Sequence, residues 1–421
     1  MHQRRTGHDN VTAKLADGKL AADATRHDKQ APCLCPARSS GSSTLLSTAP
    51  PKECTAQGYP TLPDGSSRNQ SNNKMRQSSR RLPLPNKGVP MSKDIVAKLD
   101  DKLRAKRESF DKIPVIDIAP LLNGSNKQGV AKEIRWALSN TGFMYVKNHG
   151  IPLDFVDSVF DVSRRFFDLP MSQKMSLHVS KSDVALRGYI EPFGENTDPG
   201  KTRDLKECFD IGPERSTLEG PFFGPNQWPS NLTEFRELTY GYHQKMVELA
   251  KKLLQGIALS LDLSERYFES RMRQPISIQR LLHYPPQSGY IGEEIIGIGA
   301  HTDYGNLTIL AQDDVGGLQV MNRDCDWIEG IPIPGTFVIN IGDLIQRLTN
   351  DVYLANMHRV VNTSGRERYS MPFFIDADFN AIIKPLPSCV TDSNPLRYKR
   401  VTCGEHKFAR FAASYAHLAK A

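Results

Sequence analysis

The sequence predicts a mainly β fold of the sandwich or barrel type, with helices placed before and around the β core. From Ile276 onward, apolar residues recur with a period of two, in short runs that Gly, Pro, Asn and Asp separate. Many short strands at regular spacing are typical of sandwiches and barrels. Before residue 270 the apolar residues recur instead at helical spacing. The chain of 421 residues, 39% of them apolar, suffices for one large domain or two modest ones.

Residues 1–90 are expected to form a disordered, basic extension. They are rich in Ser, Gly, Pro, Asn and charged residues, and they lack apolar periodicity. Residues 1–110 hold 20 of the 54 Lys and Arg residues and 10 of the 47 Asp and Glu residues, so their net charge is +10 and that of the remainder is −3. A basic extension can contact nucleic acid or an anionic membrane. These charges are dispersed, however, which favours a solvated extension without a nucleic-acid partner.

Cysteine usage and the lack of long apolar segments favour a cytoplasmic protein. The 7 cysteines are scattered, which is typical of free thiols in a reducing compartment. No apolar run approaches the length of a membrane span. The first 30 residues include Asp9, Asp17, Asp23 and Asp28, and such acidic residues argue against an organelle transit peptide.

The part of the chain before residue 270 is expected to alternate helices with two short strands. Met91, a candidate alternative start, opens a short charged helix that extends to about residue 110. The elements expected next are a strand at 115–118, a helix at 130–140, a strand at 143–146, a helix at 153–168 that Pro170 ends, and a helix at 232–261. In the last helix, Met246, Leu249 and Leu253 belong to the apolar stripe that faces the core.

The part after residue 276 is expected to consist mainly of strands. They are predicted at 277–284, 294–301, 307–312, 317–321, 336–341, 356–361 and 369–375. The resulting division is an extension at 1–90, an α/β support region at 91–270, the β core at 271–380, and a C-terminal extension that packs on the core at 381–421. We find no internal repeat.

His301, Asp303 and His358 are the candidate metal ligands. His301 and Asp303 are two residues apart, so on a strand both side chains point the same way and can reach one ion. His358 follows 57 residues later and has to come from a distant strand that folds back beside the first. Two imidazoles and one carboxylate form the facial triad of non-haem Fe(II) oxygenases, which leaves coordination positions open for substrates and O2.

Arg368, Ser370 and Tyr284 are the candidate residues for binding a carboxylate. Arg368 and Ser370 are again two residues apart, so a guanidinium and a hydroxyl converge on one point. Arginine binds a carboxylate in a planar, bidentate way. Tyr284 can add a third hydrogen bond from the strand that opens the β core.

The motifs after residue 280 resemble those of one known family. The run Tyr284-Pro285-Pro286, His301-x-Asp303, Asn340-Ile341-Gly342-Asp343, His358-Arg359-Val360 and Arg368-x-Ser370 is similar to that of the Fe(II)/2-oxoglutarate dioxygenases of the isopenicillin N synthase-like class. The resemblance spans roughly 113–415. It includes the segments 113–117 and 142–152, which resemble the N-terminal domain of that family.

The resemblance implies a double-stranded β-helix, or jelly roll, with flanking helices. It implies that the triad holds Fe(II), and that Arg368 and Ser370, assisted by Tyr284, grip the distal carboxylate of 2-oxoglutarate. The family couples O2 and the conversion of 2-oxoglutarate to succinate and CO2 with the oxidation of an organic substrate. We therefore expect a dioxygenase that hydroxylates, desaturates or cyclises a small molecule. We further expect a monomer, with ascorbate as a reductant.

Two other functions remain open at this point. An oxidase of the isopenicillin N synthase type uses the same triad without 2-oxoglutarate, and its Arg/Ser pair holds the carboxylate of the substrate itself. A non-catalytic binding protein could keep the jelly roll and use its basic extension to dock a partner. The intact triad argues against this third function, because buried ligand residues without a metal go unsatisfied.

Some residues near these motifs have a structural interpretation or depart from the family pattern. His149, His243 and His283 are expected to be structural, with His283 facing outward. Candidates for the mouth of the cavity are the segments 187–189 and 204–210, together with Phe374. Plant members of the family usually carry Asn at the position of Leu282 and Asn-Gly at 350–351, where this chain has Asn-Asp. These differences leave the triad intact, but they argue against transferring the substrate of a plant enzyme.

Overall fold

The structure is a computed structural model that describes residues 98–106, 113–197 and 201–414. The predicted extension at 1–90 and the candidate start at Met91 lie outside the described residues. No helix among the described residues is both long and apolar enough to cross a membrane.

The larger of two facing sheets has eight strands. Its order is β2 (Val115–Asp117), β3 (Phe143–Lys147), β14 (Thr336–Ile341), β11 (Leu307–Gln312), β16 (Arg368–Asp378), β7 (Pro275–Tyr284), β6 (Glu207–Ile211) and β4 (Gly188–Ile190). Except for the parallel pair β2–β3, neighbouring strands are antiparallel. The sheet therefore combines strands from the predicted support region with strands from the predicted core.

The second sheet has four strands and covers part of the first. Its order is β10 (Ile298–His301), β15 (His358–Val360), β12 (Leu318–Met321) and β13 (Trp327–Glu329). Leu318 and Val320 of this sheet form one apolar cluster with Phe143 and Val338 of the larger sheet. The two sheets thus share a core, and together they form the double-stranded β-helix that the resemblance implied.

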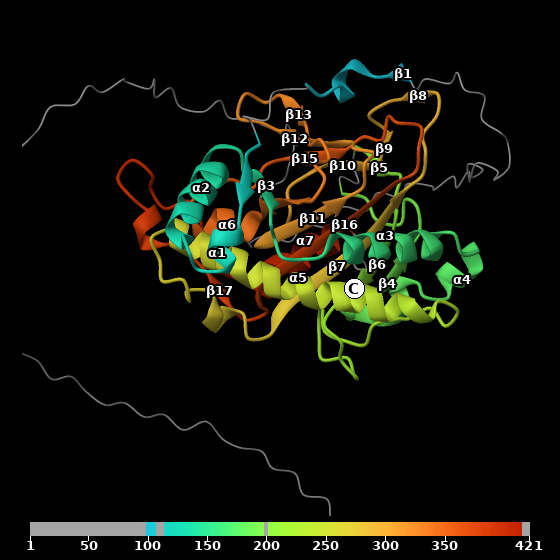
Figure 1. The fold of residues 1–421 in the computed structure, drawn as a ribbon, viewed down its shortest axis with the longest axis horizontal. Coiled ribbons are helices and arrows are strands. Elements are labelled where there is room, and N and C mark those ends of the chain that lie inside the picture. Colours follow the sequence, from blue (N-terminus) through green and yellow to red (C-terminus); the bar gives the residue numbers. More distant parts are fainter. Residues whose placement is uncertain (1–97, 107–112, 198–200, 415–421) are drawn as a thin grey trace, which may run out of the picture. The chain divides into compact units, whose positions relative to one another are not determined.

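Helices cover the opposite face of the larger sheet (Figure 1). They are α1 (Ala119–Leu122), α2 (Lys127–Asn140), α3 (Leu153–Phe167) and the long α5 (Thr233–Ser260). Helix α5 buries Met246, Leu249 and Leu253, as its apolar spacing predicts, and it contacts β7, β11 and β16. At Gly256 a side chain would collide with Ile134, so glycine lets α2 and α5 approach closely. Because helices cover one face and the second sheet covers the other, β7 is buried on both sides.

Short elements complete the described part of the chain. The paired short strands are β1 (Lys98–Leu99) with β8 (Tyr290–Ile291), β5 (Arg203–Asp204) with β9 (Ile295–Ile296), and β17 (Ile382–Ile383) with β18 (Val401–Thr402). The remaining helices are α4 (Met171–Met175), α6 (Asp343–Leu348), α7 (Cys403–Ser414) and the 3-10 helices 101–103, 179–185, 269–271 and 387–389.

Most strand predictions are confirmed, and four sequence-based predictions are wrong. The strand predicted at 294–301 is divided into β9 and β10 at Gly297, where a side chain would collide with Val360. Residues 98–106 contain β1 and a 3-10 turn rather than a charged helix. Free thiols are confirmed at three buried cysteines, but Cys325 is disulfide-bonded. His283, finally, is buried rather than facing outward. Strand β13 and helices α6 and α7 were not predicted, because their apolar runs are short.

Candidate active site

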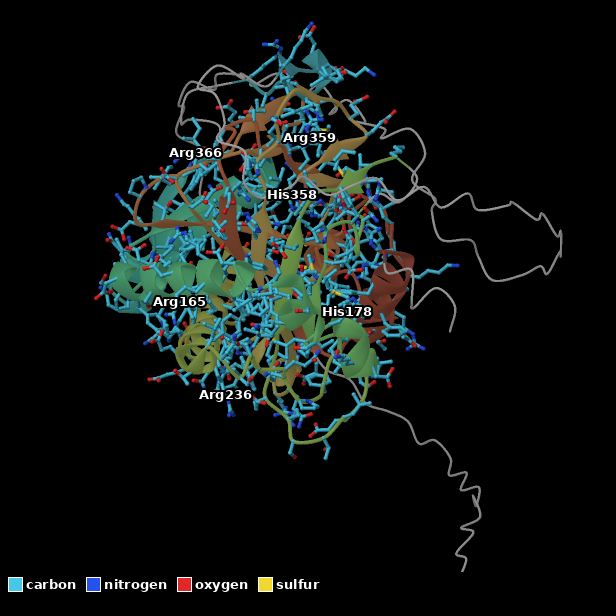
Figure 2. All side chains as sticks on the ribbon, turned by 90° about the vertical axis from the view of Figure 1, so that its right-hand side faces the viewer. Arg165, His178, Arg236, His358, Arg359 and Arg366 are labelled. Atoms are coloured by element: carbon cyan, nitrogen blue, oxygen red, sulfur yellow. The ribbon has the colours of Figure 1, made fainter. Side chains whose placement is uncertain are left out.

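The three predicted metal ligands meet at one end of the four-stranded sheet. Strands β10 and β15 are antiparallel neighbours, and their register places His301 directly opposite His358. The Oδ1 atom of Asp303 lies 3.8 Å from Nε2 of His301 and 3.7 Å from Nε2 of His358. One ligand atom of each residue lies within 4.8 Å of the others, so the three side chains can hold a single ion. Figure 2 shows His358 among packed side chains, whereas Arg236 lies at the periphery.

Hydrogen bonds aim each ligand atom at the common point. Nδ1 of His301 lies 2.8 Å from the Gly299 carbonyl, and Nδ1 of His358 lies 3.2 Å from the Asn356 carbonyl. A carbonyl oxygen only accepts, so in both rings the proton is on Nδ1 and the Nε2 lone pair faces the other ligands. This arrangement gives each imidazole the tautomer that binds a metal through Nε2.

The carboxylate of Asp303 is fixed from its other side. Its Oδ2 atom accepts hydrogen bonds from the Thr308 hydroxyl at 2.5 Å and from the Asn340 amide at 2.6 Å. Both partners stand on strands of the larger sheet, β11 and β14, so the two sheets are joined through this carboxylate. Only Oδ1 remains directed toward the two imidazoles. Sequence reasoning did not find Thr308, and it used Asn340 only as part of a motif.

The protonation states of His301 and Asp303 suit metal binding. Burial, together with the nearby His358, lowers the pKa of His301 to about 4, so the ring is neutral at physiological pH. Burial alone raises the pKa of Asp303, but His358, His301 and the two hydrogen bonds outweigh it, so the net pKa is lowered and the group is ionised. Neutral imidazoles and a carboxylate are the forms that bind a metal. Two nitrogen donors and one oxygen donor on one side of an ion fit Fe(II).

A buried carboxylate outside the triad supports His301. Asp204 of β5 accepts a hydrogen bond from the Gly299 amide at 2.9 Å and one from the Thr197 amide at 3.0 Å. Gly299 therefore receives support at its N–H from Asp204 and offers its carbonyl to His301. Sequence reasoning placed Asp204 only at the cavity mouth, because a support that acts through the backbone of another segment leaves no local pattern.

The three predicted carboxylate-binding residues also come together. Arg368 lies opposite Tyr284 in the register of β16 and β7, and its guanidinium carbon lies 4.7 Å from the centre of the Tyr284 ring. Its Nη1 donates to the Ser370 hydroxyl at 3.1 Å, and its Nε donates to the Gly316 carbonyl. The side chains of Arg368, Ser370 and Tyr284 are each about 1% exposed. Burial raises the pKa of Tyr284, although Arg368 opposes this, so the phenol remains a hydrogen-bond donor.

The buried charge of Arg368 lacks an acidic partner among the described residues, since none of their carboxylates forms an ion pair with it. A buried, unpaired guanidinium is costly and is usually matched by an anion. The same cavity is lined by His301, Asp303, His358, Arg368, Ser370 and Tyr284. An anion bound to Arg368 can therefore extend toward the triad.

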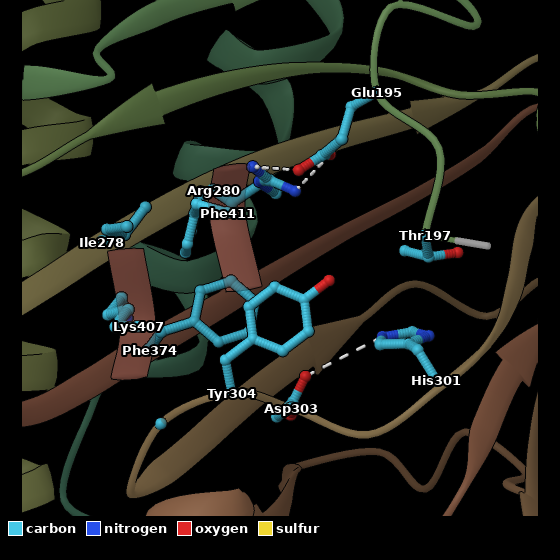
Figure 3. Close-up of a pocket in the computed structure, with 11 residues that line it drawn as sticks. Glu195, Thr197, Ile278, Arg280, His301, Asp303, Tyr304, Phe374, Lys407 and Phe411 are labelled. Carbon is cyan, nitrogen blue, oxygen red and sulfur yellow. Dashed lines mark hydrogen bonds and ion pairs between the residues drawn. The ribbon is translucent and has the colours of Figure 1, made fainter. Parts of the chain in front are cut away.

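A second cavity adjoins the first at the triad (Figure 3). The two share Thr197, Arg280, His301, Asp303 and Phe374 in their linings. The second is closed by residues of separate segments, among them Tyr304 after the triad, Glu195, and Lys407 and Phe411 of helix α7. A molecule in the second cavity would lie beside His301 and Asp303, and so beside a metal ion that they hold.

The remaining candidates from the sequence divide between core and cavity. His283 contacts Glu207 at 2.7 Å on the face of β7 away from the cavity, and His149 accepts from its own turn, at the Ile151 amide. His243 contacts Ser277 at 3.0 Å in the core. Within the segment 187–189, Arg187 donates to backbone carbonyls and Tyr189 donates to Glu207, so neither reaches the cavity. Phe374 lines both cavities, as predicted.

Comparisons with known proteins agree with this geometry. Residues 113–231 match the family described as non-haem dioxygenase in morphine synthesis N-terminal. Residues 275–377 match the 2OG-Fe(II) oxygenase superfamily. The chain belongs to the 2-oxoglutarate/Fe(II)-dependent dioxygenases of the isopenicillin N synthase-like class, and it is an oxidoreductase.

Individual relatives are matched over nearly their whole length. The chain is 37% identical to the homoarginine-6-hydroxylase 2-ODD-C23 of Glycine max over 73% of this chain and 99% of the relative. It is 35% identical to the 2-oxoglutarate-Fe(II) type oxidoreductase hxnY of Emericella nidulans over 72% and 90%. Among solved structures, that of a full-length Neurospora crassa protein in complex with alpha-KG and thymine superposes with a TM-score of 0.65 at 30% identity, over 73% of this chain and 98% of that one.

Proposed function

We propose that this protein uses Fe(II), O2 and 2-oxoglutarate to hydroxylate a small organic molecule, with release of succinate and CO2. The observation that carries the proposal is the buried Arg368, which shares a cavity with the triad and has no acidic partner among the described residues. The distal carboxylate of 2-oxoglutarate supplies the missing anion. Because Arg368 and the triad line the same cavity, the keto acid end of the same molecule can point toward a metal held by the triad.

In this proposal His301, Asp303 and His358 bind Fe(II). When bound, the iron activates O2 at the expense of 2-oxoglutarate and thereby oxidises a second substrate. The protein itself supplies fixed ligand geometry. Thr308 and Asn340 hold Asp303 in place, so the carboxylate does not have to reorganise when the metal binds.

Arg368, Ser370 and Tyr284 have the role of binding and orienting 2-oxoglutarate. The guanidinium donates to the Gly316 carbonyl, to Ser370 and, at 3.4 Å, to the Gln312 side chain, which leaves two of its five N–H groups for a ligand. The Ser370 hydroxyl and the Tyr284 phenol lie beside it and can donate to the same carboxylate. A carboxylate that accepts from a pre-oriented guanidinium binds in one direction, which places the keto acid end near the triad.

The walls of this cavity keep water away from the reaction. Leu282, Leu310 and Val360 line the space between Arg368 and the triad, and Leu282 and Val360 are buried. Exclusion of water strengthens the ionic contacts with 2-oxoglutarate and limits side reactions at the metal.

The relatives support oxidation of a small molecule and differ in its identity. One relative is named a homoarginine-6-hydroxylase, and a similar structure contains thymine. Hydroxylation is therefore the reaction we propose, with desaturation and cyclisation as the other outcomes of the same chemistry. Ascorbate as a reductant, a monomeric state and a cytoplasmic location stay predictions.

Succinate formation tests the proposal. The full chain is incubated with Fe(II), ascorbate, O2 and 2-oxoglutarate, with and without a metabolite extract. We expect succinate that requires Fe(II) and that increases when the extract is added. Substrate oxidation without any succinate from a folded, iron-loaded protein would contradict the proposal and would indicate the 2-oxoglutarate-independent oxidase instead.

A further inference from the structure

The second cavity is lined by both signs of charge, and their pairing bears on the substrate. Among the described residues of its lining, the charged ones other than Asp303 are Glu195, Arg280 and Lys407, and the apolar part includes the rings of Tyr304, Phe374 and Phe411. Charged walls can mean either that a charged substrate is bound or that the walls neutralise each other. The contacts of each charged group distinguish the two cases.

Arg280 is fully matched by two carboxylates. Its Nε and Nη2 atoms contact the two oxygens of Asp210, both at 2.8 Å, and its Nη1 contacts Glu195 at 2.7 Å. All three side chains are nearly buried, with Arg280 11%, Glu195 7% and Asp210 1% exposed. The Arg280 guanidinium thus lies between two carboxylates, and Figure 3 shows its contact with Glu195.

The remaining cations are paired as well. Lys407 of helix α7 forms an ion pair with Asp376 of β16, and both side chains are buried. Lys206, which lines the first cavity, lies 2.9 Å from Asp204 and 3.4 Å from Glu195. Glu195 therefore contacts two cations at once. Each of these cations and carboxylates already forms an ion pair within the protein, whereas Arg368 in the first cavity forms none with a described residue.

We infer that the organic substrate is a small molecule without net charge, held by its ring against Phe374, Tyr304 and Phe411. A substrate carboxylate would have to displace Asp210, Glu195 or Asp376 from a buried ion pair, and a substrate ammonium would have to displace a cation. Breaking a buried pair leaves an uncompensated charge, which costs more than the new contact returns. Aromatic walls with a few polar groups favour a flat molecule that carries hydrogen-bonding atoms. This inference rests on the proposed function.

Three probes of the same shape and different charge test the inference. They are benzamide, which is uncharged, benzoate, which is an anion, and benzamidine, which is a cation. The full chain is saturated with 2-oxoglutarate, which occupies Arg368, and with Mn(II), which prevents turnover. Binding is measured from the rise in melting temperature as a function of probe concentration. We expect benzamide to bind at least about tenfold more tightly than either charged probe.

A variant tests the stated cause. Asp376→Asn keeps a hydrogen-bond acceptor but leaves the Lys407 ammonium without its counter-charge, so benzoate binding should increase relative to benzamide. Glu269→Gln makes the corresponding change in the exposed Arg266–Glu269 pair and should leave the order of the probes unchanged.

The outcomes separate this inference from the proposed function. Equal responses to the three probes, or tighter binding of a charged probe, would overturn the inference. A folded Asp376→Asn protein with the wild-type ratio of benzoate to benzamide affinity would also overturn it, because ion pairing would not then set the preference. Failure to bind 2-oxoglutarate, measured in the same experiment without probes, would instead contradict the proposed function.

Discussion

The two cavities that meet at the triad are built in different ways. The first, between Arg368 and the triad, takes its polar groups from paired strands, with His301 opposite His358 and Arg368 opposite Tyr284. The second takes its charged groups from segments far apart in the sequence, such as Glu195 and helix α7. The first holds a buried guanidinium without a carboxylate partner among the described residues, whereas Glu195, Arg280 and Lys407 of the second each contact a group of opposite charge.

This difference separates the constant part of the chemistry from its specificity. Strand register fixes relative positions closely, which suits a metal and a cosubstrate that are the same in every turnover. Loops and a terminal helix can vary without disturbing the sheets, which suits the recognition of one substrate among many. If the two cavities have separate roles, a substitution in one cavity should change the binding of its own ligand and leave binding in the other cavity unchanged.

Removal of the metal-binding carboxylate should have the largest effect. Asp303→Ala is expected to abolish iron binding and succinate formation, because two imidazoles alone do not hold Fe(II) in a three-ligand site. Iron content after anaerobic loading and circular dichroism measure binding and folding. Asp303→Asn, which keeps acceptors for Thr308 and Asn340, serves as the milder variant. Turnover retained by a folded Asp303→Ala protein would remove the metal assignment.

Loss of the Arg368 guanidinium should weaken the binding of 2-oxoglutarate and leave metal binding unchanged. Arg368→Ala is expected to weaken 2-oxoglutarate binding by about 2–5 kcal/mol, since one partner of a buried charge pair is lost. Titration of the metal-loaded protein with 2-oxoglutarate measures this. Arg366→Ala, two residues away in a surface pair with Asp314, is the control and should bind normally. Unchanged 2-oxoglutarate affinity in Arg368→Ala would favour the oxidase alternative.

The support of Asp303 should have an intermediate effect. Thr308→Val keeps the shape of the side chain but removes the 2.5 Å hydrogen bond to Oδ2 of Asp303. We expect metal affinity to decrease by about 10–100-fold, as for other residues that orient a metal ligand. Competition with a chelator of known affinity measures the metal affinity of each variant. Thr239→Val, in the buried helix α5, makes the same change away from the site, and equal losses in both variants would argue against a positioning role.

A change in the second cavity should leave the first unaffected. Phe411→Ala removes an aromatic wall of the second cavity and is expected to weaken binding of the organic substrate by about 1–3 kcal/mol. The affinity for 2-oxoglutarate should remain that of the wild type. Phe408→Ala lies on the same helix outside the described cavity linings and is the matched control. A parallel loss of 2-oxoglutarate affinity in Phe411→Ala would show that the two cavities are not independent.

The smallest effect is expected at the turn after α6, outside both cavities. Asp351 has a φ of 67°, which glycine adopts without strain, but its carboxylate accepts from the Tyr398 hydroxyl at 2.6 Å and lies 3.3 Å from the half-exposed Arg397 guanidinium. In Asp351→Gly the relief of strain offsets most of the loss of the hydrogen bond and of the weak, solvent-exposed ion pair, so the free energy of unfolding should change by less than about 1 kcal/mol. Asp351→Ala loses the bond and keeps the strain, so it should be destabilised more. Chemical denaturation compares the two variants.

Much of the β core and the candidate site could be predicted because they depend on short-range rules. A period of two places His301 with Asp303, and Arg368 with Ser370, on the same face of a strand. The long helix α5 was predicted because its apolar stripe extends over many turns. By contrast, the strand predicted at 294–301 is interrupted at Gly297, since Val360 of a neighbouring strand occupies the space that a side chain would need.

The sequence by itself therefore determined most of the strands and the pairs His301/Asp303 and Arg368/Ser370, since each follows from residues close together in the chain. Only the tertiary structure decided what supports and surrounds them. Asp204 supports His301 through the backbone of Gly299, and Lys407 is paired with Asp376 of β16. Such contacts join segments whose separation in the sequence carries no periodic signal. They arise because a buried charge has to find a partner wherever the folded chain provides one.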